Sequence, residues 1–467
     1  MRNSKATGVF LAIFAILSLS SCGGGSNQLN PTPAVHQASV FTVGTDAPLP
    51  SVVSCEITVT GLTINNGAND ISVMPDNPQV IDFAQLSGLH QLMDLNTVPS
   101  DATYYYATVT LSNPSIGYLD TSVSPPIVNT MAGTLTTSTV KVVFAQPFVL
   151  NDNDLVGLRM EFDLRKSILT DMNGNFTGQV NPTFYMKLLA AGDSDVSIDD
   201  FHAGFVGSAG ANSFKVQGPH GRQWTVQTND STTWDDPAIP VSSFTSNTIL
   251  EISGQLDPVT MGIDASEVEV VSNDGFVLGG LLTYVNPPSP APATQADLYV
   301  RYELPDITGL MPGQIEALTL NGTEQYRIAN IKNPITALLF SNTQLAPGQR
   351  VDIGGKVTTT NGVDTLTPHR VVLRRQGQAG TWQPGSTMVQ SGNAGTFSLN
   401  DDWTAGVLLP SPLTVLTTDD TNFINLAGLS ALTGPNPIPI RVVGFILVDS
   451  ATNQPVMVAR SVEQLTD

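Results

Sequence analysis

The amino-acid sequence predicts an all-β chain, with an N-terminal β-sandwich-like domain followed by three small β-barrel-like repeat units. Apolar and polar residues alternate over short segments that Gly, Pro, Asn and Asp separate, as in strands joined by turns. Only 13% of the 467 residues are charged, against roughly 25% in an average domain. Thr, Ser, Asn and Gly take their place, which suits solvent-facing strands. Finally, one strand motif with an interior glycine recurs along the chain.

The N-terminus has the layout of an export signal. Arg2 and Lys5 give a positive start, Val9–Leu17 is an unbroken apolar run, and small residues precede Cys22. The run is too short to span a bilayer, which takes roughly 20 apolar residues. The Leu-Ser-Ser-Cys at its end resembles the lipobox of a bacterial lipoprotein, whose cysteine is lipidated. We therefore expect a signal peptide over residues 1–21 and a palmitate-type lipid on Cys22. The alternative is an ordinary secretory signal with a chance cysteine.

Residues 22–38 are predicted to form a flexible tether, because they lack apolar periodicity and are rich in Gly, Ser, Asn and Pro. Gly23 stands where an Asp would resemble the inner-membrane retention signal of some bacteria. The resemblance therefore implies a bacterial cell-envelope protein, held in the outer membrane by its N-terminal lipid anchor. It leaves open whether the protein faces the periplasm or the surface.

The remaining cysteine is expected to be buried and inert. If Cys22 carries lipid, Cys55 has no cysteine left to pair with. Alternation places Cys55 on the same apolar strand face as Val53 and Ile57. We therefore expect a packed thiol rather than a reactive one.

The chain is acidic, with a formal net charge of −21, and its longest basic cluster is Arg374-Arg375. Binding to phosphate requires stripes of Lys and Arg. The composition therefore excludes nucleic acid and anionic lipid surfaces as partners. Five histidines are present and no two lie at metal-ligand spacing on one element, so we expect no cofactor.

The first folded domain is expected over residues 39–192. A short helix or loop is expected over 84–94. Strand patterns run through Val52–Ile64, Gln79–Phe83, Thr103–Leu111, Thr139–Phe144, Leu155–Leu164 and Thr183–Leu189. Several short strands with turn signals between them favour a sandwich.

The rest of the chain repeats, which predicts units over residues 193–273, 274–377 and 378–467. An interior glycine in a strand marks a bulge or a close backbone approach, and closure into a barrel removes exposed strand edges. The repeated strand reads Leu250-Glu251-Ile252-Ser253-Gly254-Gln255-Leu256, Val351-Asp352-Ile353-Gly354-Gly355-Lys356-Val357 and Ile440-Arg441-Val442-Val443-Gly444-Phe445-Ile446. Each copy is followed by a second anchor, which reads Ala265-x-x-Val268, Pro368-x-x-Val371 and Ala459-x-x-Val462.

A Thr/Asp pattern links the first and third copies, and the second copy lacks it. Thr228, Asp230 and Thr232 share one parity with the apolar Val226, so the run is not a regular strand with an apolar face. We expect a strand that runs into a turn stabilised by side-chain bonds; a shared ligand face is the alternative. The full pattern comprises Val226, Thr228, Asp230, Thr232 and Trp234, matched by Val415, Thr417, Asp419, Thr421 and Phe423.

These segments resemble two families of bacterial modules. The N-terminal part is similar to domain of unknown function 4382, and the repeats, through the Thr/Asp pattern and Ile252-Ser253-Gly254, to domain of unknown function 5666. Pro114–Ser124 departs from the first pattern as an insertion. Both modules occur in exported lipoproteins, and neither implies a reaction or ligand. The N-terminal resemblance lies in Thr45-Asp46-Ala47-Pro48, Cys55–Leu62, Val80-Ile81-Asp82-Phe83 and Asp163–Ile168.

Two groups of residues are candidate sites. Asp171, Asn173 and Asn175 place oxygen side chains at alternate positions, as calcium loops do, although Pro182 stands where an EF-hand needs Glu. Hairpin-turn chemistry is the alternative. Tyr104 and Tyr106 share one strand face and, if exposed, would stack on sugars or anchor a protein contact. Cross-strand packing is the alternative.

A further cluster is Asp200 with His202, which would share a strand face and could begin a metal site. The alternative is a domain-boundary loop with solvated charges. The sequence contains no nucleophile elbow, P-loop or dinucleotide fingerprint. We therefore expect a non-catalytic binding or structural module that contacts glycan or an envelope protein. An unrecognised carbohydrate-active or other hydrolase is the alternative.

Overall fold

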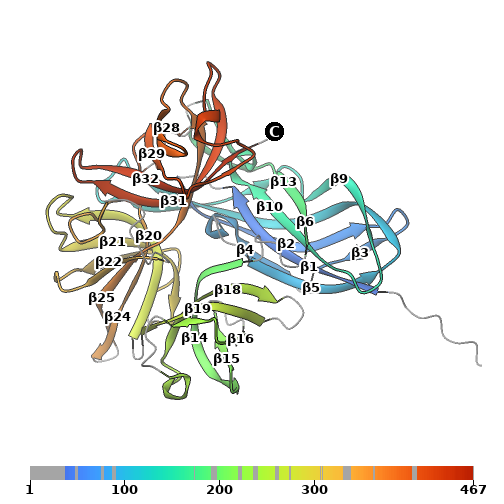
Figure 1. Cartoon of the computed structure of the whole chain (residues 1–467), viewed down its shortest axis with the longest axis horizontal. Coiled ribbons are helices and arrows are strands. Elements are labelled where there is room, and N and C mark those ends of the chain that lie inside the picture. The colour runs from blue at the N-terminus through green and yellow to red at the C-terminus, as the bar shows by residue number, and fades with distance from the viewer. Residues whose placement is uncertain are drawn as a thin grey trace, which may run out of the picture. The chain divides into compact units, whose positions relative to one another are not determined.

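The computed structural model describes residues 37–47, 51–74, 78–86, 91–172, 174–190, 197–218, 223–234, 240–257, 262–272, 275–305, 307, 309–329, 338–360, 363–401 and 408–465. Nearly all regular structure in these ranges is β-strand (Figure 1), which confirms the all-β class. In the same ranges no helix is long and apolar enough to cross a membrane. The predicted signal peptide, Cys22 and nearly all of the tether lie outside the described residues. The helical turns are η1 (Phe83–Leu86), α1 (Leu164–Ser167), η4 (Val241–Ser243) and η5 (Leu429–Ala431).

Residues 37–190 form three sheets. Sheet 1 has the strand order β13-β10-β1-β5, and sheet 3 has the order β11-β12-β8. Sheet 2 has the order β3-β2-β6-β7, and β4 and β9 pair with β2 and β6. The strands are β1 (Gln37–Ala47), β2 (Val52–Asn65), β3 (Asp70–Ser72), β4 (Gln79–Asp82), β5 (Gln91–Pro99), β6 (Ala102–Asp120), β7 (Ile127–Ala132), β8 (Thr134–Leu135), β9 (Thr139–Leu150), β10 (Leu155–Asp163), β11 (Ile168–Thr170), β12 (Phe176–Val180) and β13 (Phe184–Ala190).

One hydrophobic core contains side chains from sheets 1 and 2, with Met160 and Phe162 from β10 and Ile57 from β2. Alternation along β2 turns every second side chain inward. Cys55 lies on this inward face and is fully buried, which confirms the expected burial of its thiol.

Two segments of this part need comment. Pro114–Ser124, interpreted as an insertion in the family pattern, begins as regular strand: β6 continues to Asp120 and pairs with β2 and β7. The expected helix or loop over 84–94 is a 3-10 turn that ends at Leu86, and β5 begins at Gln91.

Residues 197–464 form three further sheets. Their orders are β16-β15-β14-β18-β19-β17 in sheet 4, β22-β21-β20-β24-β25-β23 in sheet 5 and β26-β31-β32-β29-β28-β27 in sheet 6. The strands are β14 (Ser197–Gly210), β15 (Ser213–Gln217), β16 (Gln223–Gln227), β17 (Thr233–Trp234), β18 (Ile249–Asp257), β19 (Gly262–Ser272), β20 (Gly275–Asn286), β21 (Gln295–Leu304), β22 (Ile315–Thr319), β23 (Gln325–Ile328), β24 (Arg350–Thr360), β25 (Val363–Leu373), β26 (Gln376–Trp382), β27 (Met388–Ser391), β28 (Ala394–Asn400), β29 (Leu413–Thr417), β30 (Asn422–Ile424), β31 (Ile438–Asp449) and β32 (Gln454–Gln464).

The three sheets share one pairing scheme. In each, the first strand pairs antiparallel with a strand that carries the repeated motif: β14 with β18, β20 with β24 and β26 with β31. The motif strand pairs in turn with the strand that follows it. In sheets 4 and 6, parallel pairings of β16 with β19 and of β29 with β32 close a ring of strands.

The three motif glycines occupy equivalent positions. The strand register shifts at Gly254, Gly355 and Gly444. A Cβ at each of them would overlap a backbone carbonyl oxygen of the partner strand, that of Asp264, Thr367 or Val458 respectively. The predicted bulge with close backbone approach is thus confirmed in all three copies.

The Thr/Asp pattern is a strand that runs into a turn, as expected. The Thr232 hydroxyl accepts from the backbone N–H of Asn229 at 2.9 Å and donates to the carbonyl of Ala265 at 2.8 Å. Thr421 makes the same two bonds, with Thr418 N–H and the carbonyl of Ala459, both at 2.9 Å.

The second copy performs the same turn with another residue. Glu324 accepts from the backbone N–H of Asn321 at 2.6 Å, where the other copies use a threonine hydroxyl. Short strands then follow in all three sheets, and Trp234, Tyr326 and Phe423 each pair with the valine of the second anchor. The pattern is therefore present in the second copy with altered residues.

Candidate functional site

The most concentrated group of polar side chains is buried between sheets 4 and 5. It consists of His202 on β14, Glu251 on β18, Asp352 on β24 and Arg374 in the link between β25 and β26. Their exposed fractions are 3%, 5%, 4% and 2% respectively. The hydroxyl of Tyr302, on β21, completes the group. We call these five residues the Arg374 cluster.

The repeated strand motif places the two carboxylates. Glu251 and Asp352 are each the second residue of the motif, three positions before the bulge glycine, so the two copies present them equivalently. Across the sheet, Glu251 pairs with His202 on β14, whereas Asp352 pairs with Gly279 on β20. A Cβ on Gly279 would collide with the ring of Tyr302. Glycine at that position therefore makes room for the aromatic ring.

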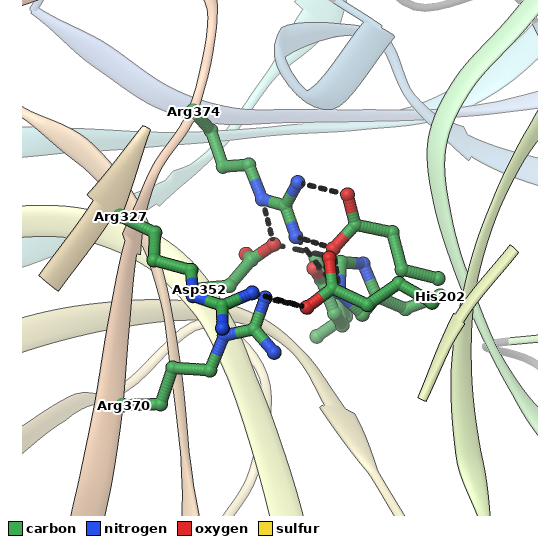
Figure 2. Close-up of polar contacts among 8 residues, drawn as sticks. His202, Arg327, Asp352, Arg370 and Arg374 are labelled. Carbon is green, nitrogen blue, oxygen red and sulfur yellow. Dashed lines mark hydrogen bonds and ion pairs between the residues drawn. The ribbon is translucent and has the colours of Figure 1, made fainter. Parts of the chain in front are cut away.

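Arg374 forms the centre of the cluster (Figure 2). Its Nη1 and Nη2 donate to Oε1 and Oε2 of Glu251 at 2.7 and 2.6 Å, a bidentate pair. Its Nε donates to Oδ2 of Asp352. The guanidinium thus joins carboxylates from two sheets, and its backbone N–H is held by the carbonyl of Arg350 at 2.8 Å.

Both ring nitrogens of His202 make contacts within the cluster. Nε2 lies 2.9 Å from Nη2 of Arg374 and 3.4 Å from Oε2 of Glu251. A guanidinium can only donate, so Nε2 is the acceptor in its contact with Arg374. Nδ1 faces the hydroxyl of Tyr302 at 3.1 Å and Oδ2 of Asp352 at 3.5 Å.

The electrostatics follow from burial and from Arg374. Burial opposes ionisation of Glu251, but the charge and hydrogen bonds of Arg374 outweigh it and hold the pKa of Glu251 well below its usual value. Burial, together with the negative charge of Asp352, raises the pKa of Tyr302 well above the ordinary value. Tyr302 therefore stays protonated and Glu251 stays ionised at neutral pH.

A second ion-pair group joins the same two sheets. Glu269 on β19 pairs with Arg370 on β25, and its Oε1 also lies 3.2 Å from Nη1 of Arg327 on β23. Figure 2 shows Arg327 and Arg370 pointing toward one carboxylate beside the Arg374 cluster.

The Arg374 cluster is a buried network of ion pairs and hydrogen bonds, with the chemistry of a structural contact. Its guanidinium is hydrogen-bonded to both carboxylates and to the histidine, and all four of these side chains are buried. Within the described ranges no group of three or more His, Cys, Asp or Glu residues could hold a metal ion. The sequence offered two interpretations of His202, the start of a metal site or a residue of a solvated loop. The residue lies instead in β14, buried and in contact with Arg374. The side chain of Asp200 lies outside the described residues.

For Tyr104, the structure shows the packing alternative rather than a binding surface. Its ring is fully buried and stacks on Phe148, and its hydroxyl donates to the carbonyl of Pro99 at 2.7 Å. The register shifts between Tyr104 and Tyr106, so the two rings do not share an exposed face. Tyr106 is half-buried, and Nζ of Lys141 lies 3.5 Å above its ring centre. Tyr105 is the exposed ring of the three, at 43%.

The candidate calcium loop makes the hydrogen bonds of a hairpin turn. The two carboxylate oxygens of Asp171 accept from the backbone and side-chain nitrogens of Asn175, at 2.9 and 3.1 Å. Gly174 has a φ of 82°, which its lack of a Cβ permits. Asn173 lies outside the described residues.

Sequence reasoning missed the Arg374 cluster, although signals were present. Arg374 belongs to the longest basic cluster of the chain, and Glu251 and Asp352 occupy the same position of the repeated motif, each between two apolar residues. A charge repeated at a fixed place in a buried strand requires a buried partner. That rule points to an arginine without identifying which one.

The comparison with protein families gives one match. Residues 38–178 match the model described as Domain of unknown function (DUF4382). The N-terminal domain thus resembles this family. The comparison with curated proteins finds no match.

Proposed function

We propose that this protein is a lipid-anchored envelope protein that works as a non-catalytic binding or structural module. The observation that carries the proposal is the Arg374 cluster. Its charged groups are satisfied by one another and hold strands of two sheets together. Catalytic groups need access to substrate, whereas the members of this cluster are buried and bonded to one another.

We also propose the finer architecture on which this function depends. Residues 39–192 form a β-sandwich, supported by the core that sheets 1 and 2 share. Residues 193–273, 274–377 and 378–467 form three barrels like domain of unknown function 5666. The equivalent bulge glycines and common pairing scheme support this division. The strand order also follows that of small five-stranded barrels that bind oligomeric ligands, and the charge of −21 argues against nucleic acid as that ligand.

The partner class we propose is a glycan or an envelope protein, bound at a surface rather than in a deep cleft. On the N-terminal domain, the exposed Tyr105 beside Tyr106 offers aromatic surface for such a contact. Lys141 covers one face of Tyr106, so Tyr105 is the ring to test first.

Two experiments test the proposal. Cys22→Ala should move the protein from the outer-membrane fraction to the soluble fraction while its circular dichroism stays unchanged. Retention in the membrane fraction would contradict the lipid anchor. The soluble form should then be tested on glycan arrays and in envelope pull-downs, with Tyr105→Ala as the variant and Tyr185→Ala, another exposed tyrosine of this domain, as the matched control.

One observation favours the alternative of an unrecognised hydrolase. His202 lies beside two carboxylates, the residue types of general acid–base catalysis. If hydrolysis occurs at this cluster, His202→Ala should abolish turnover of glycoside and ester substrates without changing the thermal midpoint. A structural role predicts the reverse: no turnover in either protein and a lower thermal midpoint in the variant.

A further inference from the structure

The Arg374 cluster joins sheets 4 and 5, and a separate buried contact joins sheet 2 to sheet 5. Val53 on β2, Leu119 on β6 and Tyr299 on β21 form one small apolar cluster. The side chain of Ser54, next to Val53 on β2, partly offsets the rise that burial causes in the pKa of Tyr299. The N-terminal part of the chain thus packs directly on β21, through a surface that is partly apolar and partly polar.

Asp82 lies at the edge of this contact. Its Oδ1 accepts from the backbone N–H groups of Cys55 and Ala84, at 2.7 and 3.0 Å. Its Oδ2 is buried and has no hydrogen-bond partner among the described residues. A buried carboxylate oxygen without a donor is a costly place for negative charge, and protonation relieves that cost.

The charged and titratable groups that act on Asp82 come from two strands. From β21, Arg301 favours the ionised carboxylate; from β2, Glu56 disfavours it. Tyr299 on β21 has a raised pKa, mainly through burial and partly through the charge of Asp82. Burial of Asp82 dominates, and it raises the pKa of this carboxyl from 3.8 to about 6.

We infer that Asp82 is a proton-binding switch that makes the contact between the N-terminal domain and β21 tighter in mildly acidic medium than at neutral pH. Each side of the contact supplies one part of the switch. Strand β4 supplies the buried carboxyl, β2 supplies a backbone N–H that bonds to it, and β21 supplies a guanidinium that favours its ionisation.

The sign of the effect follows from linkage. A carboxyl that binds its proton more tightly in the folded state stabilises that state at low pH, and this stabilisation is lost as pH rises through the folded-state pKa. A pKa of about 6 against 3.8 corresponds to roughly a hundredfold higher proton affinity. The contact should therefore strengthen as pH falls from 7 toward 4.

The first experiment compares the full protein with Asp82→Asn, which keeps an acceptor for Cys55 and Ala84 but cannot titrate. The thermal midpoint of the wild type minus that of the variant should stay constant above pH 7 and climb by a few degrees between pH 6 and 4. Asp449→Asn is the control, since Asp449 lies in an exposed hairpin turn and its pKa is lowered. If the difference in thermal midpoint between the wild type and Asp82→Asn does not change with pH, the inference is overturned.

The second experiment tests whether the switch belongs to the contact. Arg301→Gln removes the cation that favours ionisation of Asp82. As pH falls, the stabilisation that depends on Asp82 should therefore begin to rise at a higher pH in this variant than in the wild type. Hydrogen-exchange protection of β2, β4 and β21 should rise about fivefold between pH 6 and 5 in the wild type and stay constant in Asp82→Asn. An unchanged onset in Arg301→Gln would show that β21 takes no part.

Discussion

Sheet 5 meets sheets 4 and 6 in different ways. It meets sheet 4 through the Arg374 cluster and the Glu269 pairs, with a small apolar cluster of Ile249, Val277 and Leu304 beside them. It meets sheet 6 mainly through apolar side chains, since Phe445 and Leu447 belong to the core of sheet 5 itself. Uncharged hydrogen bonds accompany them, such as that from Nε2 of Gln349 to the carbonyl of Ile446 at 3.1 Å. The two junctions thus show two ways of joining similar β-units.

The two junctions should tolerate different amino-acid substitutions. An apolar junction gains stability roughly in proportion to the area it buries, so side chains of similar volume can replace one another. A buried ionic junction gains little net stability, because desolvation of the charges offsets their attraction. It nevertheless fixes one geometry, since removing a single partner leaves the others buried and uncompensated.

The largest expected effect is that of Arg374→Met. The variant keeps most of the side-chain volume but leaves Glu251 and Asp352 buried without their cation. We expect a loss of about 3–5 kcal/mol in the free energy of unfolding, the usual cost of breaking a buried ion pair from one side. Urea denaturation followed by tryptophan fluorescence measures it.

The control removes all the charges together. The triple variant Arg374→Met, Glu251→Gln and Asp352→Asn should recover a large part of that loss, because no uncompensated charge remains. If Arg374→Met alone costs less than about 1 kcal/mol, the cluster does not lock the junction, and the contrast with the apolar side disappears.

The apolar junction should respond to volume instead. Leu447→Ala removes a buried side chain from the shared core and should cost about 2–4 kcal/mol, as large-to-small core substitutions do. Leu447→Met should cost less than about 1.5 kcal/mol. The corresponding conservative change on the other side, Arg374→Lys, should be poorly tolerated, because lysine cannot reproduce the bidentate contact. Equal tolerance of both changes would contradict the distinction.

The contrast also explains what the sequence could reveal. Alternation predicted the strands and the burial of Cys55, because the apolar residues of a strand themselves mark the face that is buried. The repeated glycines predicted their bulges for the same reason: a missing side chain in Gly254, Gly355 and Gly444 reports a local close approach.

The Arg374 cluster could not be predicted in this way. Arg374 and Glu251 lie 123 positions apart, and Arg374 and His202 lie 172 apart. Their contact depends on how two sheets pack, and no local pattern encodes that. Tyr104 shows a smaller version of the problem, because one register shift in β6 reverses the face that alternation assigns.

Acid should weaken the ionic junction in a defined range. The folded-state pKa of Glu251 is held well below its ordinary 4.5, so the stabilisation is present above pH 4.5 and is lost as pH falls toward the folded value. The stability of wild type minus that of Glu251→Gln should be constant from pH 8 to 5, then decline by up to about 1.4 kcal/mol per pH unit. This sign is opposite to that expected for Asp82. A decline that begins above pH 6 would mean that another group controls this junction.

The smallest expected effect lies at the edge of the apolar junction. The hydroxyl of Ser289, in the proline-rich loop after β20, lies 2.7 Å from the carbonyl of Thr343 and 2.8 Å from Oδ1 of Asn453, in the turn between β31 and β32. The side chain of Asn453 also donates to the carbonyl of Ser289 at 2.7 Å. Because water can replace these partly exposed bonds, Ser289→Ala should cost about 0.5–1 kcal/mol in urea denaturation. A cost above about 2 kcal/mol, the size of a core truncation, would mean that polar contacts support this junction as strongly as its apolar side chains do. The two sides of sheet 5 would then differ in degree rather than in kind.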